Sequence, residues 1–276
     1  MPESGPFIAL TVDERARRAP RGTTLFALRD ALKPGADVLV VNGFPRTADV
    51  ELADGDVVAL IRRGEIPARD ELEALMAARH TPGVHARLKR AAAGIAGCGG
   101  LGSAAAIALA RVGIGRLRLV DFDVVEPSNL NRQQFFVDQI GRPKVEALAE
   151  NLARINPFVV VETERRRIGR DDAAAVFAGC DVVLECFDDP RAKRDLLLGL
   201  RAGAPATPLV AASGVAGFGT ANSVRVRRAM ENVWVVGDGE TAAAPGTGLM
   251  APRVGVAAHH QANAALRLIL GLDPVE

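Results

Sequence analysis

Three glycines at fixed spacing begin a stretch whose residue types could hold a nucleotide. In "GIAGCGGLGSAAAIALARVGIGRLRLVDFD" (residues 94–123), Gly97, Gly99 and Gly102 fill the GxGxxG positions, and Asp121 follows Gly102 by nineteen residues. Glycines at a strand-to-helix turn let a phosphate approach the backbone, and an acid after the next strand can bind ribose hydroxyls. The spacing predicts a nucleotide-binding turn, with close helix packing as the alternative use of the glycines.

Polar and cationic side chains follow this turn in quick succession. The stretch "DFDVVEPSNLNRQQFFVDQIGRPKVEAL" (residues 121–148) contains Asn129, Arg132, Gln133 and Lys144. A guanidinium fork can bind two phosphate oxygens, and an ammonium group supplies a compact charge. The set indicates a triphosphate rather than a dinucleotide, although Arg132 and Lys144 could also lie on solvated helix faces.

Carboxylates follow another apolar run further along the chain. In "DVVLECFDDP" (residues 181–190), Glu185 and Asp188 come at the end of an expected buried strand. Ligands of α/β sheets bind beyond the carboxyl ends of the strands, and Mg²⁺ on a nucleotide needs one or two carboxylates. The position predicts a magnesium ligand, with helix capping by Asp188 or Asp189 as the competing role.

Strands that alternate with helices must position these groups. From residue 92 onward the pattern alternates, which predicts a parallel sheet covered on both faces. Residues 7–64 instead read as strands around one helix, "TTLFALRDAL", and predict a small α+β unit. We therefore expect domains at 1–65 and 92–276, joined by a helical connector at 66–91.

The composition argues against several classes of function. Lys and Arg total 34 against 33 Asp and Glu, so no net field attracts nucleic acid or an anionic membrane. No apolar run is long enough to span a bilayer, and the three cysteines form no CxxC pair. We expect a cytoplasmic protein with reduced thiols, no zinc, and neither a nucleic-acid nor a membrane partner.

Several motifs resemble one known family. "GCGGLGS", "LVDFDVVEPSNLNRQ", "GRPKVEAL", "INPFV", "ECFDD" and "GLMAPRVGVAAHHQAN" follow one another in the order found in the ThiF/MoeB family, bacterial relatives of ubiquitin-activating enzymes. The resemblance covers about residues 79–271, and the N-terminal unit resembles the β-grasp sulfur carrier ThiS. The resemblance implies a Rossmann-like, mostly parallel sheet preceded by a β-grasp domain. The combination looks most like the ThiF enzymes of thiamine biosynthesis that carry a ThiS-like extension.

The resemblance also implies an activity and its residues. The activity is ATP-dependent adenylation of the C-terminal glycine carboxylate of a ThiS-like sulfur carrier in thiamine biosynthesis, by a homodimer that works with a sulfur-donor protein. By position, Asp121 would bind ribose, Asn129, Arg132, Gln133 and Lys144 would bind phosphates, Asp188 would bind Mg²⁺, and Arg79 would reach the partner subunit's site.

Two departures from the family pattern refine the expectation. The zinc-binding CxxC pairs of the family are missing, and no cysteine lies between Gly214 and Gly248. The second absence predicts adenylation without a covalent enzyme–carrier intermediate. The single Gly64 runs straight into an expected helix, so residues 1–64 offer no free carboxylate and a separate carrier is expected.

The residues leave further classes of function open. An NAD-dependent oxidoreductase would share the glycine turn, but His80, His85, His259 and His260 form no convincing pair with an acid for proton transfer. A non-catalytic scaffold also remains open, as does an enzyme that adenylates a small molecule or a tRNA base.

Overall fold

Alternating apolar residues build the sheet of the first of two units. The computed structural model describes residues 5–275, and the chain divides into Met1–His85 and Ala86–Glu276, here called the first and second units. The first unit has a five-stranded sheet in the order β2-β1-β5-β3-β4, antiparallel except where β1 pairs with β5. Its strands are β1 (Phe7–Val12), β2 (Arg15–Pro20), β3 (Val38–Val41), β4 (Phe44–Arg46) and β5 (Val57–Ile61).

One helix covers one face of this sheet. Helix α1 (Leu25–Leu32) begins after Thr24, whose hydroxyl accepts a hydrogen bond from the N–H of Ala27 at 3.3 Å. Its buried Leu25 and Leu28 join every second residue of β1, β3 and β5 in one core. The mixed sheet with α1 packed on one face confirms the β-grasp prediction.

A second helix, α2 (Arg69–Ala77), belongs to the same unit and contacts β5. Val40 and Ala59 are cross-strand partners on the face opposite α1, and both are buried. Ala74 and Ala77 of α2 are buried as well, and Glu71 forms an ion pair with Lys33, which follows α1. The expected connector thus contains α2 inside the first unit and α3 (Val84–Leu88), which crosses the division.

The second unit has a seven-stranded sheet in the order β11-β12-β10-β9-β6-β7-β8. All neighbours are parallel except β11 and β12, which form an antiparallel pair at one edge. The strands are β6 (Ala92–Ala96), β7 (Arg116–Val120), β8 (Val160–Glu164), β9 (Val182–Glu185), β10 (Leu209–Ala212), β11 (Arg225–Met230) and β12 (Val233–Gly237).

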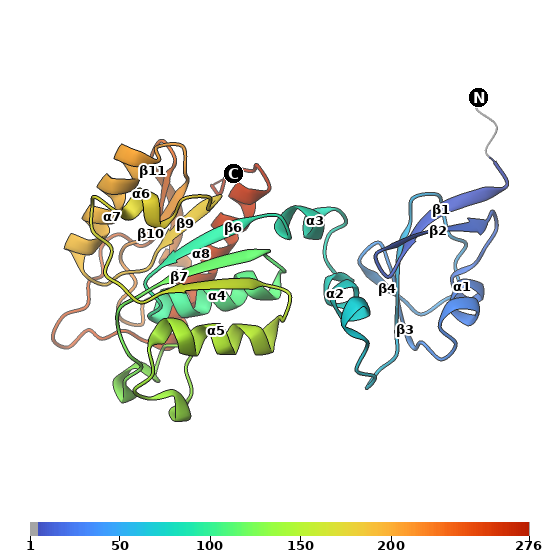
Figure 1. The fold of residues 1–276 in the computed structure, drawn as a ribbon, viewed down its shortest axis with the longest axis horizontal. Helices are drawn as coiled ribbons and strands as arrows, with labels where there is room; N and C mark the ends of the chain where they lie inside the picture. The colour runs from blue at the N-terminus through green and yellow to red at the C-terminus, as the bar shows by residue number, and fades with distance from the viewer. Residues whose placement is uncertain (1–4, 276) are drawn as a thin grey trace. The chain divides into compact units, whose positions relative to one another are not determined.

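Helices lie on both faces of this sheet (Figure 1). Leu101, Leu148 and Val254, from three helices, belong to the core of one face, and Leu196 belongs to the core of the other. The first face carries α4 (Gly100–Arg111), α5 (Lys144–Ile155) and α8 (Ala251–Ile269), and the second carries α6 (Ala173–Val176) and α7 (Pro190–Gly203). The predicted doubly covered parallel sheet is confirmed.

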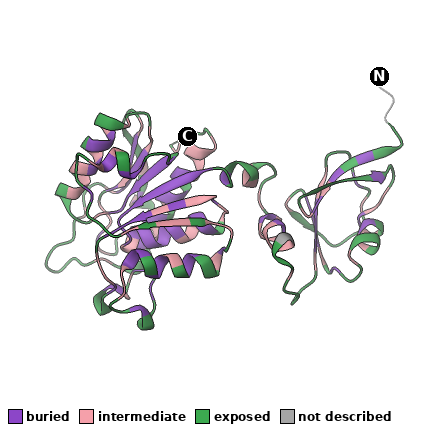
Figure 2. Cartoon of the chain, viewed as in Figure 1, coloured by how far each residue is buried: buried purple, intermediate pink, exposed green. Residues whose placement is uncertain are grey.

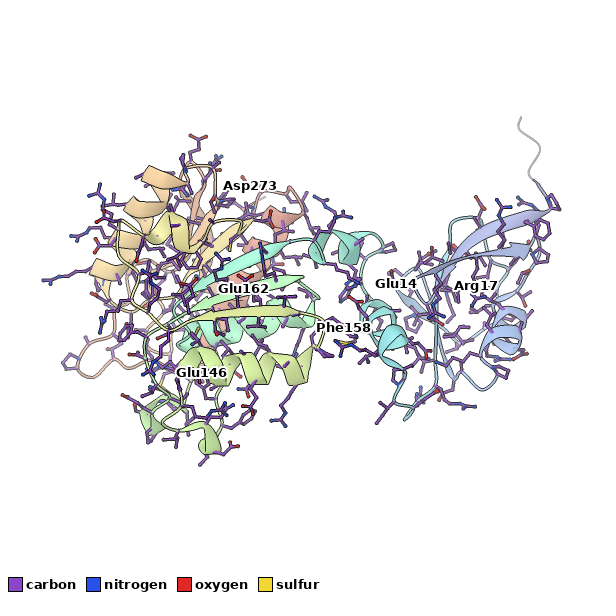
Figure 3. All side chains as sticks on the ribbon, viewed as in Figure 1. Glu14, Arg17, Glu146, Phe158, Glu162 and Asp273 are labelled. Carbon is purple, nitrogen blue, oxygen red and sulfur yellow. The ribbon has the colours of Figure 1, made fainter. Side chains whose placement is uncertain are left out.

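The central strands are the most deeply buried part of the second unit. Every residue of β6 and β9 is buried, as Figure 2 shows, whereas the edge strand β8 is partly exposed. Glu162 on β8 (Figure 3) accepts a hydrogen bond from Nε of Arg118 on β7 at 2.8 Å, and Nη2 of Arg118 forms an ion pair with the same carboxylate at 2.7 Å. Across residues 5–275, no helix combines the length and apolarity needed to cross a bilayer.

Candidate nucleotide site

The glycine turn (residues 97–102) joins β6 to α4. Gly97 has a φ of +95°, and a Cβ on it would lie 3.0 Å from the carbonyl oxygen of Cys186. A Cβ on Gly102 would lie only 1.8 Å from the carbonyl oxygen of Gly97. Glycine is therefore required at both positions, and α4 starts close to the end of β6 with its N-terminal N–H groups at the carboxyl edge of the sheet.

Asp121, which follows β7, is tied to this turn. Its Oδ2 accepts a hydrogen bond from the N–H of Cys98 at 2.6 Å, and its Oδ1 accepts one from the N–H of Asp123 at 2.8 Å. The side chain fixes the glycine turn against the end of β7. Each carboxylate oxygen has a second lone pair, so the expected ribose contact stays a prediction that this geometry permits.

Lys144 is the first residue of α5 and is held next to the same loop. Its N–H donates to the carbonyl oxygen of Asp123 at 2.9 Å, and its Nζ lies 3.1 Å from Oδ2 of Asp123. Lys144 is buried while the Asp123 side chain is half-exposed. The structure thus places the predicted phosphate lysine beside the nucleotide turn, already paired with an acid.

Asn129 organises the turn that carries the next two candidates. Its Oδ1 accepts from the N–H of Glu126 at 3.1 Å, and its carbonyl oxygen accepts from the N–H groups of Arg132 and Gln133 at 3.1 and 2.9 Å. Asn129 is buried, and its side-chain amide and its backbone carbonyl together stabilise the loop that holds Arg132 and Gln133. Direct contact between Asn129 and a phosphate stays a prediction.

Gln133 and Arg132 border the glycine turn. The Nε2 of Gln133 lies 3.7 Å from the place that a Cβ on Gly99 would take, and its buried Oε1 has no hydrogen-bond partner among the described residues. Leaving a buried amide oxygen unpaired costs about 1–3 kcal/mol, so this position favours a ligand hydroxyl or amine. The Cγ of Arg132 lies 3.5 Å from the corresponding place on Gly100, at the start of α4.

Asp188 lies just past β9, on the other side of the glycine turn. A Cβ on Gly97 would lie 3.0 Å from the ring of Phe187, the residue before Asp188, and Asp188 itself is exposed. Asp189 caps α7 by accepting from the N–H of Arg191 at 3.0 Å, so the capping role falls on Asp189. Asp188 is therefore available at the same edge of the sheet.

Glu185, the other candidate acid, is engaged inside the protein. Lys193 Nζ lies 2.9 Å from both of its carboxylate oxygens and also donates to the carbonyl oxygen of Ala212. Burial raises the pKa of Glu185, and the charge of Lys193 opposes that shift. Glu185 shapes the end of β9 and does not face a ligand.

No dedicated metal cage accompanies these residues. Within the described part of the chain, no group of three or more His, Cys, Asp or Glu side chains could hold a metal ion. The exposed carboxylate of Asp188 fits a Mg²⁺ ion that takes most of its ligands from phosphates and water.

Arg79 and the histidines lie apart from these residues in the chain. Arg79 is an exposed residue near the end of the first unit, and its role at a partner subunit's site stays a prediction. His80 and His85 also belong to the first unit, with ring centroids 6.0 Å apart. On α8, Nδ1 of His259 lies 2.8 Å from the carbonyl oxygen of Gly255.

The sequence reasoning missed two partners in the second unit. Asp123 contacts Lys144, and Lys193 neutralises Glu185. The second acid of "DFD" was a signal for the first contact, since it lies next to the ribose acid. Nothing in the sequence singled out Lys193 among the charges of its helix.

Two family models match different parts of this chain. Residues 73–276 match the model described as the ThiF family, and residues 8–64 match the one described as ThiS-like ubiquitin. The molybdopterin-synthase adenylyltransferase of Salmonella typhimurium is 34% identical over 190 residues, covering 66% of this chain and 74% of that protein. Its Escherichia coli counterpart is 34% identical over 185 residues, covering 64% and 72%.

A solved structure has the same architecture. The Escherichia coli tRNA N6-threonylcarbamoyladenosine dehydratase TcdA superposes with a TM-score of 0.64 at 25% identity, covering 71% of this chain and 92% of that one. Together the matches confirm the resemblance drawn from the motifs and the expected enzyme class, an adenylyltransferase. Because the family match spans well over half of its residues, the chain belongs to the ThiF family.

Proposed function

We propose that this protein uses ATP to adenylate the C-terminal carboxylate of a separate ThiS-like sulfur carrier. The observation that carries the proposal is the arrangement around the glycine turn, where Arg132 and Gln133 border the start of α4 and the segment after β9 presents Asp188. Lys144 is fixed nearby through Asp123. This group suits a nucleoside triphosphate because it combines cations, backbone N–H groups and one free carboxylate.

The chemistry follows from charge. A carboxylate oxygen of the carrier forms a bond to the α-phosphorus of ATP, the bond from that phosphorus to the bridging oxygen breaks, and pyrophosphate leaves. Two anions must meet, so Arg132, Lys144 and the N-terminus of α4 would neutralise the charge that builds up on the phosphates. The carrier's carboxylate is ionised at neutral pH, and no general base is required.

Asp188 would hold Mg²⁺ together with the phosphates. When bound there, Mg²⁺ supplies positive charge to the departing pyrophosphate. Lys144 keeps its orientation through Asp123, whose half-exposed carboxylate can release it toward a phosphate.

The carrier is a separate chain because the first unit has no free carboxylate at Gly64. The chain continues from Gly64 into α2, whose buried Ala74 and Ala77 make it part of the first unit. Cleavage in the exposed stretch around Gly64 and Ile66 is the alternative route to a free terminus. We propose that the first unit instead serves as a docking or regulatory module.

The thiols of the second unit suit a reaction without a covalent enzyme–carrier intermediate. Cys98, Cys180 and Cys186 are all buried, and burial raises the pKa of each thiol. A thiol with a raised pKa is protonated at neutral pH and is a poor nucleophile. The acyl-adenylate would then react directly with a sulfur donor protein.

We propose that the enzyme acts as a homodimer. Phe136, Val137 and Ile140, which follow the phosphate-binding motif, are 55%, 74% and 41% exposed. We propose that a partner subunit covers these side chains and that, as the family resemblance implies, the partner subunit also supplies an arginine, Arg79 being the candidate.

The pathway depends on which carrier is accepted. The sequence predicts thiamine biosynthesis, whereas the relatives above are named for molybdopterin synthase. Purified enzyme, ATP and Mg²⁺ would be mixed with a thiamine-type carrier, a molybdopterin-type carrier or a carrier lacking its last glycine, and pyrophosphate release followed. Release with the thiamine-type carrier alone supports the full proposal. If none of the carriers raises pyrophosphate release above that of the carrier-free reaction, the proposal is overturned. Loss of release in Arg132→Ala, but not in Arg111→Ala at the exposed end of α4, would show that this site is responsible.

A further inference from the structure

A buried arginine begins the last helix, outside the groups assigned above. Arg253 lies in the first turn of α8 and is 4% exposed. Its Nη1 donates to the carbonyl oxygens of Gly219 and Thr220, both at 3.0 Å. Its Nη2 donates to Ser223 Oγ at 3.2 Å and to Asp238 Oδ2 at 2.6 Å. A guanidinium buried this deeply needs such bonds to offset its desolvation.

Asp238, the ion-pair partner of Arg253, accepts further hydrogen bonds from residues that follow it in the chain. Its Oδ1 accepts from the N–H groups of Glu240 and Thr241 at 2.8 and 2.9 Å, and its Oδ2 accepts from the Thr241 hydroxyl at 2.9 Å. Burial alone would raise the pKa of Asp238, but these bonds and the charge of Arg253 lower it to about 2. The carboxylate therefore stays ionised, and the pair stays intact, throughout the neutral range.

The Arg253–Asp238 pair links two parts of the crossover segment, which is the stretch of residues 213–250 between β10 and α8. Arg253 binds its early part at Gly219, and Asp238 binds its later part at Thr241. Between them, the N–H of Asp238 donates to the carbonyl oxygen of Gly214 at 3.0 Å. Two stretches far apart in this segment are thus held at one point.

The same helix turn contacts the nucleotide site. The Cγ1 of Val254, the next residue after Arg253, lies 2.9 Å from the place that a Cβ on Gly100 would take, and Arg132 borders the same glycine. The crossover segment also leaves β10 at the carboxyl edge of the sheet, where the glycine turn lies. Val254, and not Arg253, makes the contact with the start of α4, whereas the hydrogen bonds of Arg253 go to the crossover segment.

The part of the crossover segment that Arg253 binds has features that suit binding of an extended peptide. Residues 214–220 read "GVAGFGT", with three glycines and the side chain of Phe218 89% exposed. Small residues leave backbone groups accessible to a second extended chain, and an exposed aromatic ring offers an apolar contact.

We propose that Arg253 and Asp238 are positioning residues that hold residues 214–220 in place for the extended C-terminal tail of the carrier. This inference rests on the function proposed above, since it names the residues that prepare the enzyme for that substrate. Neither residue touches the reacting atoms. Their loss should weaken capture of the tail and leave ATP binding intact.

The test compares steady-state kinetics of the full-length enzyme and its variants, with carrier and ATP varied separately. Asp238→Asn is expected to raise the KM for the carrier by roughly tenfold or more, since it unpairs a buried charge, with the KM for ATP unchanged within about twofold. Arg253→Lys keeps the charge opposite Asp238 but loses the fork, so an intermediate effect is expected. Asp195→Asn, at a partly exposed acid on α7 that pairs with Arg194, is the matched control and should change neither constant.

The kinetic results distinguish failure of the proposed function from failure of this inference. Wild-type enzyme without carrier-dependent pyrophosphate release would overturn the proposed function and this inference together. Active wild-type enzyme whose Asp238→Asn and Arg253→Lys variants keep the carrier KM, or raise both KM values alike, would overturn the inference alone. If Asp238→Asn fails to fold, the carrier KM of Arg253→Lys decides.

Discussion

The Nζ of Lys144 and the Oδ2 of Asp123 lie 3.1 Å apart, with the lysine buried and the acid half-exposed. Asp123 therefore orients Lys144 and balances its charge, and in the proposed mechanism a phosphate of ATP would replace this carboxylate. Such preorganisation lowers the cost of arranging charges during the reaction.

Loss of the Lys144 charge should remove much of the activity. Lys144→Met is expected to lower kcat/KM for adenylation by about 10²–10³-fold, because the developing phosphate charge loses a buried cation. Pyrophosphate release measures the effect, and Arg111→Met at the exposed end of α4 is the control for a lost surface charge. Equal activity of the two variants would remove Lys144 from the phosphate site.

The closeness of α4 to the glycine turn gives a second prediction. Gly102→Ala should destabilise the protein by about 1–3 kcal/mol and abolish ATP binding, since the new Cβ would meet the carbonyl oxygen of Gly97. Gly255→Ala in α8 is the matched control, because a Cβ there meets nothing within 4 Å and should stabilise the helix by up to about 1 kcal/mol. Thermal unfolding with and without ATP–Mg²⁺ measures both, and an ATP-dependent rise in Tm for Gly102→Ala would contradict the proposed turn.

The buried pair of Glu185 and Lys193 gives a prediction with a defined pH dependence. Lys193→Met should cost about 3–5 kcal/mol, because it leaves the carboxylate buried without a counter-charge. The pKa of Glu185 already lies above its ordinary value of 4.5, and losing Lys193 raises it further. A raised folded pKa adds stability below the unfolded pKa and loses it as the pH rises through the folded pKa.

The free energy of unfolding of Lys193→Met should therefore fall, relative to wild type, as the pH rises above the ordinary glutamate value of 4.5. Urea denaturation across this range measures it. The double variant Glu185→Gln with Lys193→Met should remove most of the pH dependence, and its persistence would place the titrating group elsewhere.

The lowered pKa of Asp238 predicts the opposite pH dependence of the free energy of unfolding. Its folded pKa of about 2 lies below the ordinary value of 3.8, so the stability that it contributes is present above that value and is lost as the pH falls toward 2. Wild type and Asp238→Asn should differ in free energy of unfolding at pH 6 and converge toward pH 2. A constant difference over this range would show that the charge of Asp238 is not what stabilises the cluster.

The choice of nucleotide separates the proposed function from an oxidoreductase. ATP–Mg²⁺ should raise the Tm, by the amount expected for a ligand that binds only the folded state, whereas NAD at the same concentration should not. A larger shift with NAD would favour hydride transfer.

Much of the fold could be predicted from local patterns. The alternation of strands and helices after residue 92 specified a parallel sheet with two covered faces, because such strands must be buried on both sides. The glycine spacing located the turn, because any side chain at Gly97 or Gly102 would lie too close to neighbouring backbone atoms.

Charge pairing could not be predicted in the same way. Lys193 reads as an ordinary helix charge, and Arg253 near a helix start reads as a surface residue, yet packing of α7 and α8 on the sheet puts one beside Glu185 and buries the other. Such partners come from elements distant in sequence, so only the packed structure reveals them. The placement of α2 within the first unit depends likewise on tertiary contact with β5.

The mass of the carrier after incubation with the enzyme tests the central claim most directly. A ThiS-like carrier with a free C-terminal glycine, incubated with ATP, Mg²⁺ and the wild-type enzyme, should gain one adenylate, whereas the same carrier without its last glycine should not. Arg132→Ala should abolish the gain while Arg111→Ala preserves it. An unchanged carrier mass in the presence of folded, ATP-binding enzyme would contradict adenylation of a sulfur carrier.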